Sequence, residues 1–177
     1  MKAKFVFDAT PLIHLTKAGL SPLIVALEGE KYTVPAVFDE VVRKGKEMDY
    51  PDAASTASLV NEGVVKVKAP QRKKADAIAR LHKDIHAGET EVIALAKEMR
   101  AIAVIDDRVA RTVAKIEGVR VEGSYGVILR AAARGSMSKD EGEGALGGLV
   151  ASGWRCDAEL YAALLKSLRE IAERRTA

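Results

Sequence analysis

Residues 101–111 have the sequence AIAVIDDRVAR, and this stretch decides the fold. An uninterrupted apolar run, Ile102–Ile105, ends at two adjacent acids, Asp106 and Asp107. Such a run is typical of a strand buried on both faces of a parallel sheet. The segment after it has helical spacing and continues to Gly118. A strand that ends in acids and leads into a helix predicts an α/β domain with chemistry at the strand end.

The same order of strand and helix recurs on both sides of this stretch. Further strands are predicted at Phe5–Phe7, Tyr32–Val34, Val64–Val67 and Val119–Val121, and helices are predicted to begin near Thr10, Pro35, Ala53, Lys73, Gly88 and Ser124. Strands that alternate with helices predict a mostly parallel central sheet. The polar stretch Lys44–Asp52 between two of these helices is predicted to be a loop.

The chain changes character after Gly135. A helix weakened by four glycines is predicted over Ser138–Gly153, and Asp157 is predicted to cap a last helix with an apolar stripe. We therefore expect one domain over residues 1–135 and a C-terminal helical extension over residues 136–177, packed on the same domain.

Composition limits the classes of protein that remain. The chain has 177 residues, a net charge of +3 and one cysteine, Cys156, which excludes an internal disulfide framework and suits a reducing cytoplasm. No run approaches the ~20 apolar residues of a membrane span, and the first apolar stretch breaks too early, at Asp8, for a signal peptide. We expect a cytoplasmic protein whose mild basicity permits nucleic-acid binding without requiring it.

Acids from four separate segments are predicted to meet at one edge of the sheet. Asp8 leaves the first strand, Asp106 and Asp107 leave the strand at 102–105, and Glu40 and Glu89 lie on helices beside that edge. Two like charges ~4 Å apart repel by about 4 kcal/mol at an effective dielectric of 20. Cations relieve such repulsion, and Mg²⁺ and Mn²⁺ prefer oxygen ligands, so the cluster points to metal-assisted phosphoryl chemistry.

Each acid also has an ordinary structural explanation. Asp8 is a possible cap of the following helix, Glu40 a solvated helix residue, and Glu89 a favourable partner for a helix dipole. Asp106 and Asp107 together fit a cap and a dipole partner for the next helix. The site is favoured because all of these positions are consistent with a single edge.

Four motifs in order resemble those of PIN domains. They are FDATPLI at residues 7–13, VPAVFDEVV at 34–42, GETEVIALA at 88–96 and VIDDRVAR at 104–111. Residues 123–129 and 153–165 extend the similarity to a prokaryotic PIN subfamily related to VapC toxins, so that it spans nearly the whole chain. The resemblance implies a three-layer α/β/α PIN-like nuclease domain over residues 1–135.

The resemblance also implies roles for individual residues. Asp8, Glu40, Glu89 and Asp106 are the implied catalytic and metal-binding acids, with Asp107 as second choice or further ligand, and Thr10 would hydrogen-bond near the metal or the scissile phosphate. Glu91 competes with Glu89 for the third position, and Asp107 competes with Asp106 for the fourth. Arg108 and Arg111 lie beside the acids, where they would either bind substrate phosphate or pair with the acids.

The function expected from this pattern is an Mg²⁺- or Mn²⁺-dependent endoribonuclease, the VapC-like toxin of a toxin–antitoxin pair. The alternative is a nonhydrolytic PIN module that binds RNA or protein as a scaffold. The presence of all four acids favours the enzyme.

Partners of three kinds are expected: an RNA substrate, a small antitoxin protein and a second copy of the chain. The basic stretch Arg72, Lys73, Lys74, Arg80 and Lys83 is either a solvated face or a contact for RNA phosphates. His82 and His86, at helical i, i+4 spacing, are interpreted as helix-surface histidines rather than a metal pair. Part of the apolar helix surface is a candidate interface: Leu12, Ile13, Leu15, Leu20, Leu23, Ile24, Leu27, Leu160, Leu164, Leu168 and Ile171.

Overall fold

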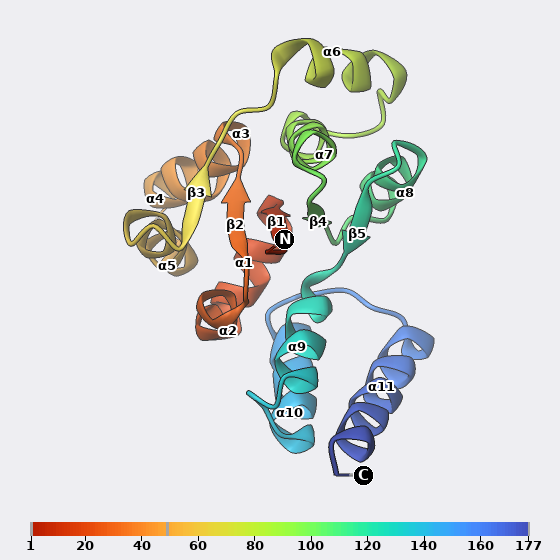
Figure 1. The fold of residues 1–177 in the computed structure, drawn as a ribbon. Coiled ribbons are helices and arrows are strands. Elements are labelled where there is room, and N and C mark those ends of the chain that lie inside the picture. The colour runs from red at the N-terminus through yellow and green to blue at the C-terminus, as the bar shows by residue number, and fades with distance from the viewer. Residues whose placement is uncertain (1, 49, 177) are drawn as a thin grey trace. The chain divides into compact units, whose positions relative to one another are not determined.

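The computed structural model describes residues 2–48 and 50–176 and contains a five-stranded sheet in which every neighbouring pair of strands is parallel (Figure 1). The strands are β1 (Lys4–Phe7), β2 (Glu30–Thr33), β3 (Val65–Val67), β4 (Ile102–Val104) and β5 (Arg120–Glu122). Their order across the sheet is β3-β2-β1-β4-β5. The predicted α/β class and parallel sheet are confirmed.

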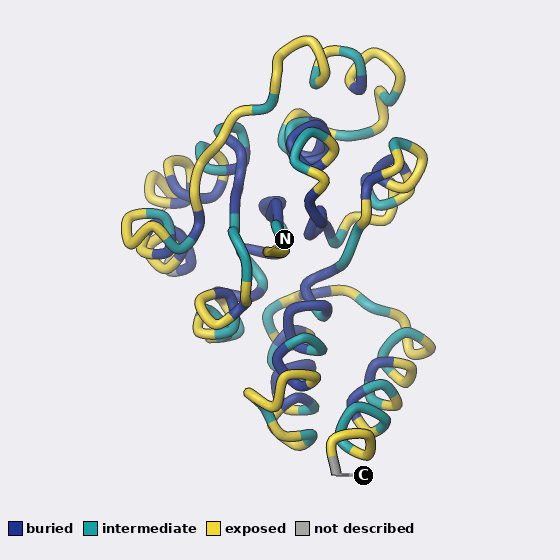
Figure 2. Tube along the Cα trace, viewed as in Figure 1, coloured by how far each residue is buried: buried dark blue, intermediate teal, exposed yellow. Residues whose placement is uncertain are grey.

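The middle of the sheet is its most buried part. Phe5 of β1 is in register with Lys31 of β2 and with Ile102 of β4. All three residues of β4 and the last three of β1 are buried, as Figure 2 shows. Burial on both faces explains why the run at 102–105 is uniformly apolar rather than alternating.

Helices make up most of the rest of the chain. They are α1 (Ala9–Lys17), α2 (Ser21–Ala26), α3 (Pro35–Phe38), the π-helical η1 (Asp39–Lys44), α4 (Gly45–Glu47), α5 (Pro51–Asn61), α6 (Arg72–Leu81), α7 (Ala87–Met99), α8 (Arg108–Ile116), α9 (Ser124–Ala133), α10 (Lys139–Ala151) and α11 (Ala158–Thr176). Among the described residues, no helix is both long and apolar enough to cross a membrane.

Two local predictions were wrong. The stretch Lys44–Asp52 is not simply a loop, because helical structure continues through Glu47 and α5 begins at Pro51. Packing of α4 against α5, and a 2.8 Å hydrogen bond from the N–H of Tyr50 to the carbonyl of Gly45, hold these polar residues in helical structure. His82 and His86 do not have the predicted helical i, i+4 spacing, because the helix that was predicted to begin near Lys73 ends at Leu81.

The chain divides into two compact units. The first comprises residues 1–13 and 28–123 and contains the whole sheet. The second comprises residues 14–27 and 124–177, in which α9 packs against α2, α10 and α11. Gly142 of α10 lies under Leu168 of α11, where a Cβ would approach a leucine methyl group to 2.9 Å, so close helix packing accounts for this glycine. The boundary at residues 135 and 136 stays a prediction.

Candidate active site

Two of the predicted acids leave neighbouring strands at the same edge. Asp8 follows β1, and Asp106 follows β4 by two residues. The N–H of Asp8 donates to the carbonyl of Val104 at 3.0 Å, so the two strands are still joined where the acids emerge. The chain builds β2 and β3 on one side of β1 and β4 and β5 on the other, and ligands of α/β sheets bind at such a point of reversal.

Asp8 is buried, with only 4% of its surface exposed. Burial, the largest cause, raises the pKa of its carboxyl from 3.8 to about 7, against the lowering effect of the N–H of Ala9. The negative charges of Glu89, Glu40 and Asp106 raise this pKa further. The fold therefore brings all four predicted acids close enough to influence one carboxyl.

Glu89 lies in the first turn of α7 and is 9% exposed. Its Oε2 accepts a 2.8 Å hydrogen bond from the N–H of His86, the residue that precedes the helix. Burial raises the pKa of the Glu89 carboxyl, the N–H of His86 opposes this, and the charges of Asp107 and Glu40 contribute to the rise. A Cβ at Gly88 would lie 3.2 Å from Val37 Cγ2 and 3.9 Å from Asp8 Oδ1, so the start of α7 packs closely on Val37 and lies beside that carboxylate.

Glu40 is exposed and lies in the π-helical segment η1. Its charge acts on both Asp8 and Glu89, which places its carboxylate on the open side of the acid cluster. Segments with π-helical geometry are rare in proteins, and those that occur are often found at functional sites. An ion pair one helical turn apart, between Arg43 and Asp39 at 3.1 Å, supports this segment at the surface.

The two competing acids have structural roles of their own. Glu91 accepts a 3.2 Å hydrogen bond at Oε2 from the N–H of Ala36, in the first turn of α3. Asp107 caps α8, accepting the N–H of Ala110 at 2.8 Å, as the structural interpretation of this pair anticipated. These bonds favour Glu89 and Asp106 as the principal acids, and that choice stays a prediction.

The three predicted substrate-binding residues differ in exposure. Thr10 is half-buried in α1, and Arg108 is exposed at the start of α8. Arg111 is half-buried, and its Nη1 donates to the carbonyl of Ile105 at 3.3 Å, which holds the guanidinium near the end of β4. All three belong to helices that begin at the edge where the acids emerge.

The donor chemistry of the cluster fits a hard divalent cation. The predicted acids offer carboxylate oxygens, the type of ligand that Mg²⁺ and Mn²⁺ prefer. Within residues 2–48 and 50–176, no three His, Cys, Asp or Glu side chains converge closely enough to hold a metal ion. Closer approach of the carboxylates would need protons or cations to offset their repulsion.

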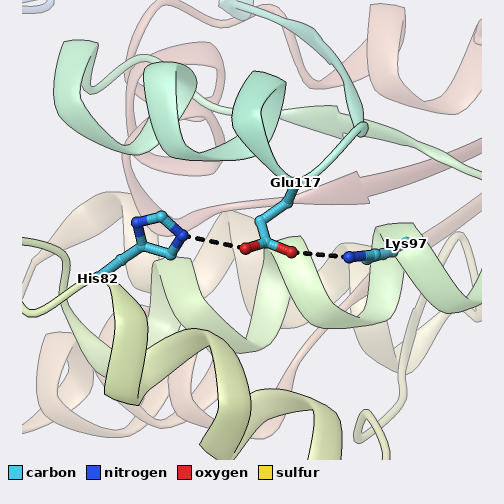
Figure 3. Close-up of polar contacts among 3 residues, drawn as sticks. All are labelled: His82, Lys97 and Glu117. Atoms are coloured by element: carbon cyan, nitrogen blue, oxygen red, sulfur yellow. Dashed lines mark hydrogen bonds and ion pairs between the residues drawn. The ribbon is translucent and has the colours of Figure 1, made fainter.

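A polar link between helices was not foreseen from the sequence. Figure 3 shows His82 and Lys97 on opposite sides of Glu117, which follows α8; His82 Nε2 lies 3.0 Å from Glu117 Oε1, and Lys97 Nζ lies 2.7 Å from Oε2. His82 follows the end of α6 and His86 precedes α7, so the two histidines do not share a helix. Nothing in the local sequence pairs residues 82 and 97 with residue 117.

Known proteins match this chain at two levels. A family model described as PIN domain matches residues 4–170. A protein of Methanocaldococcus jannaschii named "Endoribonuclease Nob1" is 32% identical over 127 residues, which cover 70% of this chain and 57% of that protein. A protein of the same name from Pyrococcus abyssi is 31% identical over 126 residues, or 68% of each chain. The chain therefore spans between about half and two thirds of the length of these relatives.

Proposed function

The chain belongs to the PIN-domain family, and from this premise we propose that it is a divalent-metal-dependent endoribonuclease. The observation that carries the proposal is the buried Asp8, whose carboxyl has its pKa raised to about 7 by burial and by three further acids. An arrangement that disfavours the ionised carboxylate destabilises the fold. Acids that a fold holds together at a strand end, despite the loss of stability, are characteristic of functional sites.

The proposed roles follow from the placement of each residue. Asp8, Glu40, Glu89 and Asp106 would hold Mg²⁺ or Mn²⁺, with Asp107 as a further ligand. When bound, the cation supplies an activated water and positive charge beside the scissile phosphate. The remaining residues position the substrate: Thr10 beside the metal, and Arg108 and Arg111 on RNA phosphate oxygens.

RNA is the proposed substrate because both relatives carry the name endoribonuclease. The acids that we assign to the site all lie between residues 8 and 107, inside the region covered by the family match. The proposed reaction is therefore hydrolysis of RNA phosphodiester bonds.

The direct test is cleavage of single-stranded RNA in the presence of Mn²⁺, Mg²⁺ or EDTA. We expect cleavage with either metal and none with EDTA. The Asp8→Asn variant should lose at least about 100-fold in rate, since a metal site supplies several kcal/mol to phosphoryl chemistry. The matched control is Asp140→Asn, which changes an exposed acid at the start of α10. RNA that binds but stays intact under all metal conditions would contradict the enzyme and support a nonhydrolytic module.

We further propose that the chain is a cytoplasmic VapC-like toxin that forms a homodimer and is silenced by a small antitoxin. The similarity of residues 123–129 and 153–165 to that subfamily supports this assignment. Several of the leucines offered as an interface, among them Leu12, Leu15, Leu164 and Leu168, are buried within the chain and are therefore unavailable. Light scattering tests the dimer, and growth arrest upon expression, relieved by the product of a neighbouring gene, tests the toxin.

A further inference from the structure

Helix α6 belongs to the first compact unit, and most of its residues are exposed (Figures 1 and 2). Ile78 is the only residue of α6 that is fully buried, and the principal packing partner of the helix is α7. Because α7 also holds Glu89, α6 borders the same helix that contributes to the acid cluster.

The segment that contains α6 concentrates positive charge. Residues 66–83 carry seven basic side chains and one acid, a net charge of +6, while the whole chain carries +3. The rest of the protein is thus net negative. The basic side chains are all exposed: Lys66, Lys68, Arg72, Lys73, Lys74, Arg80 and Lys83. A local excess of this size attracts a polyanion such as the phosphate backbone of a nucleic acid.

Both ends of α6 are anchored. Before the helix, the N–H of Gln71 donates to Glu98 Oε1 at 2.6 Å, and Glu98 belongs to α7. After the helix, His82 contacts Glu117, which also pairs with Lys97 of α7 (Figure 3). These contacts fix α6 on α7, while the basic side chains of α6 stay exposed.

A hollow of about 420 Å³ opens between α6 and the start of α7. Ala75, Ala79 and Ile85 give it an apolar wall, while Asp76, Lys83 and Glu91 supply charged groups. Its volume lies within the ~300–1,000 Å³ of small-ligand sites, and five of its nine lining residues are polar or charged, which suits a ligand with a polar edge. An unpaired nucleobase, apolar on its faces and polar at its edge, matches such a lining.

We propose that α6 binds single-stranded RNA, with backbone phosphates on its basic residues and one unpaired guanine in the hollow. The proposal rests on the proposed ribonuclease function, because it supplies that site with its substrate. Among the four bases, guanine alone has two adjacent donors, N1–H and the N2 amine, for a carboxylate, together with a carbonyl for a lysine. Asp76 or Glu91 provides the carboxylate, and Lys83 provides the cation.

Glu91 is well placed for this second role. One of its oxygens, Oε2, accepts from Ala36, and its side chain also lines the hollow. Glu91 lies two residues after Glu89 on α7 and points to another side of the helix, so α7 borders both the hollow and the acid cluster. The guanine would then select which phosphodiester is presented for cleavage.

The test measures, by fluorescence anisotropy, how tightly the wild-type protein binds short oligouridylates. EDTA is present throughout, so that cleavage is not expected. One strand carries a single guanosine, and the second carries inosine, which lacks only the N2 amine. We expect the inosine strand to bind about tenfold more weakly, the value of one good base contact. The Asp76→Asn, Glu91→Gln double variant should bind both strands equally, and its glutamine can still accept from Ala36. The control, Asp140→Asn, should keep the difference.

The phosphate contacts have a separate readout. The Lys73→Gln, Lys74→Gln variant should weaken all strands alike and reduce the slope of log affinity against log salt by about 0.7 for each lost contact. Its control, Lys166→Gln with Arg169→Gln on α11, should leave the slope unchanged. Equal binding of guanosine and inosine strands by the wild type, or an unchanged slope in the α6 variant, overturns the inference. Intact discrimination in a protein that fails to cleave RNA supports it and contradicts only the nuclease.

Discussion

Helices α7 and α10 begin with the same local arrangement and differ in what surrounds it. Glu89 accepts the N–H of His86 at 2.8 Å, and Glu141 accepts the N–H of Ser138 at 2.7 Å, each three residues into its motif. The hydrogen bonds to Ser138 lower the pKa of the exposed Glu141. Burial raises the pKa of Glu89, although it makes the equivalent bond.

This difference supports the proposal that Glu141 is a structural acid and Glu89 a functional one. Glu141 is exposed, its ionised form is stabilised, and the capping of α10 accounts for it fully. Glu89 caps its helix, but it is also buried near other acids, which disfavours its ionised form. Capping does not require this burial. Burial of Glu89 beyond what capping requires supports the proposal that α7 contributes to the site.

The largest expected effect concerns Asp8. Its carboxyl is protonated below about pH 7 in the folded protein and below 3.8 in the unfolded chain, so metal-free stability falls as pH rises from about 4 to 7. Over this window the free energy of unfolding decreases by up to about 4 kcal/mol, about 3 of them between pH 5 and 8. Asp8→Asn should remove this decrease and be more stable than wild type at pH 8, as urea unfolding in EDTA would measure.

Glu141→Gln is the control for that experiment, because an acid with a lowered pKa has the opposite sign. Glu141 stabilises α10 when ionised, so its variant should be slightly less stable than wild type at pH 8. An Asp8→Asn variant less stable than wild type at pH 8 would show that the carboxylate is favourable where it lies, and the burial argument would be wrong.

The next effect concerns Glu89 and Glu91. Glu89→Gln should reduce metal-dependent RNA cleavage by more than about 100-fold, because the variant removes a charged ligand. Glu91→Gln should retain most cleavage of a generic RNA, since glutamine still accepts from Ala36. The two residues point about 200° apart on the helix, so only one faces the acids. The reverse ranking of rates would transfer the third position of the site to Glu91.

The smallest expected effect concerns Asp107. Asp107→Ala should destabilise the protein by about 1 kcal/mol through loss of the cap on Ala110, and Asp107→Ser should restore most of that stability. Ser138→Ala at α10 should lower stability by a similar amount through the same loss. If Asp107→Ser abolishes cleavage as fully as Asp106→Asn does, then Asp107 is the principal ligand of the fourth motif.

The sheet edge was predictable because two short patterns determine it. The apolar runs at Phe5–Phe7 and 102–105 are continuous, which only a strand buried on both faces requires, and each ends at an acid. Parallel strands share one carboxyl edge, so a common edge for Asp8 and Asp106 was predictable, whereas the pairing of β1 with β4 is shown by the structure.

Features that depend on long-range contacts were not predictable. Helical structure through Glu47 depends on packing between α4 and α5. It was not predictable because a polar helix on the surface has the same amino-acid composition as a polar loop. The link from His82 to Glu117 joins residues 35 positions apart. The burial of Asp8, which raises its pKa, is likewise a property of the packed protein and not of the local motif.

The most direct test of the central claim, that these acids form a cation site, is Mn²⁺ binding by calorimetry to EDTA-stripped protein at pH 8. The account predicts that wild type and Asp140→Asn bind Mn²⁺ and gain thermal stability from it, about 2.7 kcal/mol at 100 times the dissociation constant. Asp8→Asn and Glu89→Gln should bind far more weakly and gain little. Equal binding by wild type and Asp8→Asn, or no binding by wild type, would contradict the account.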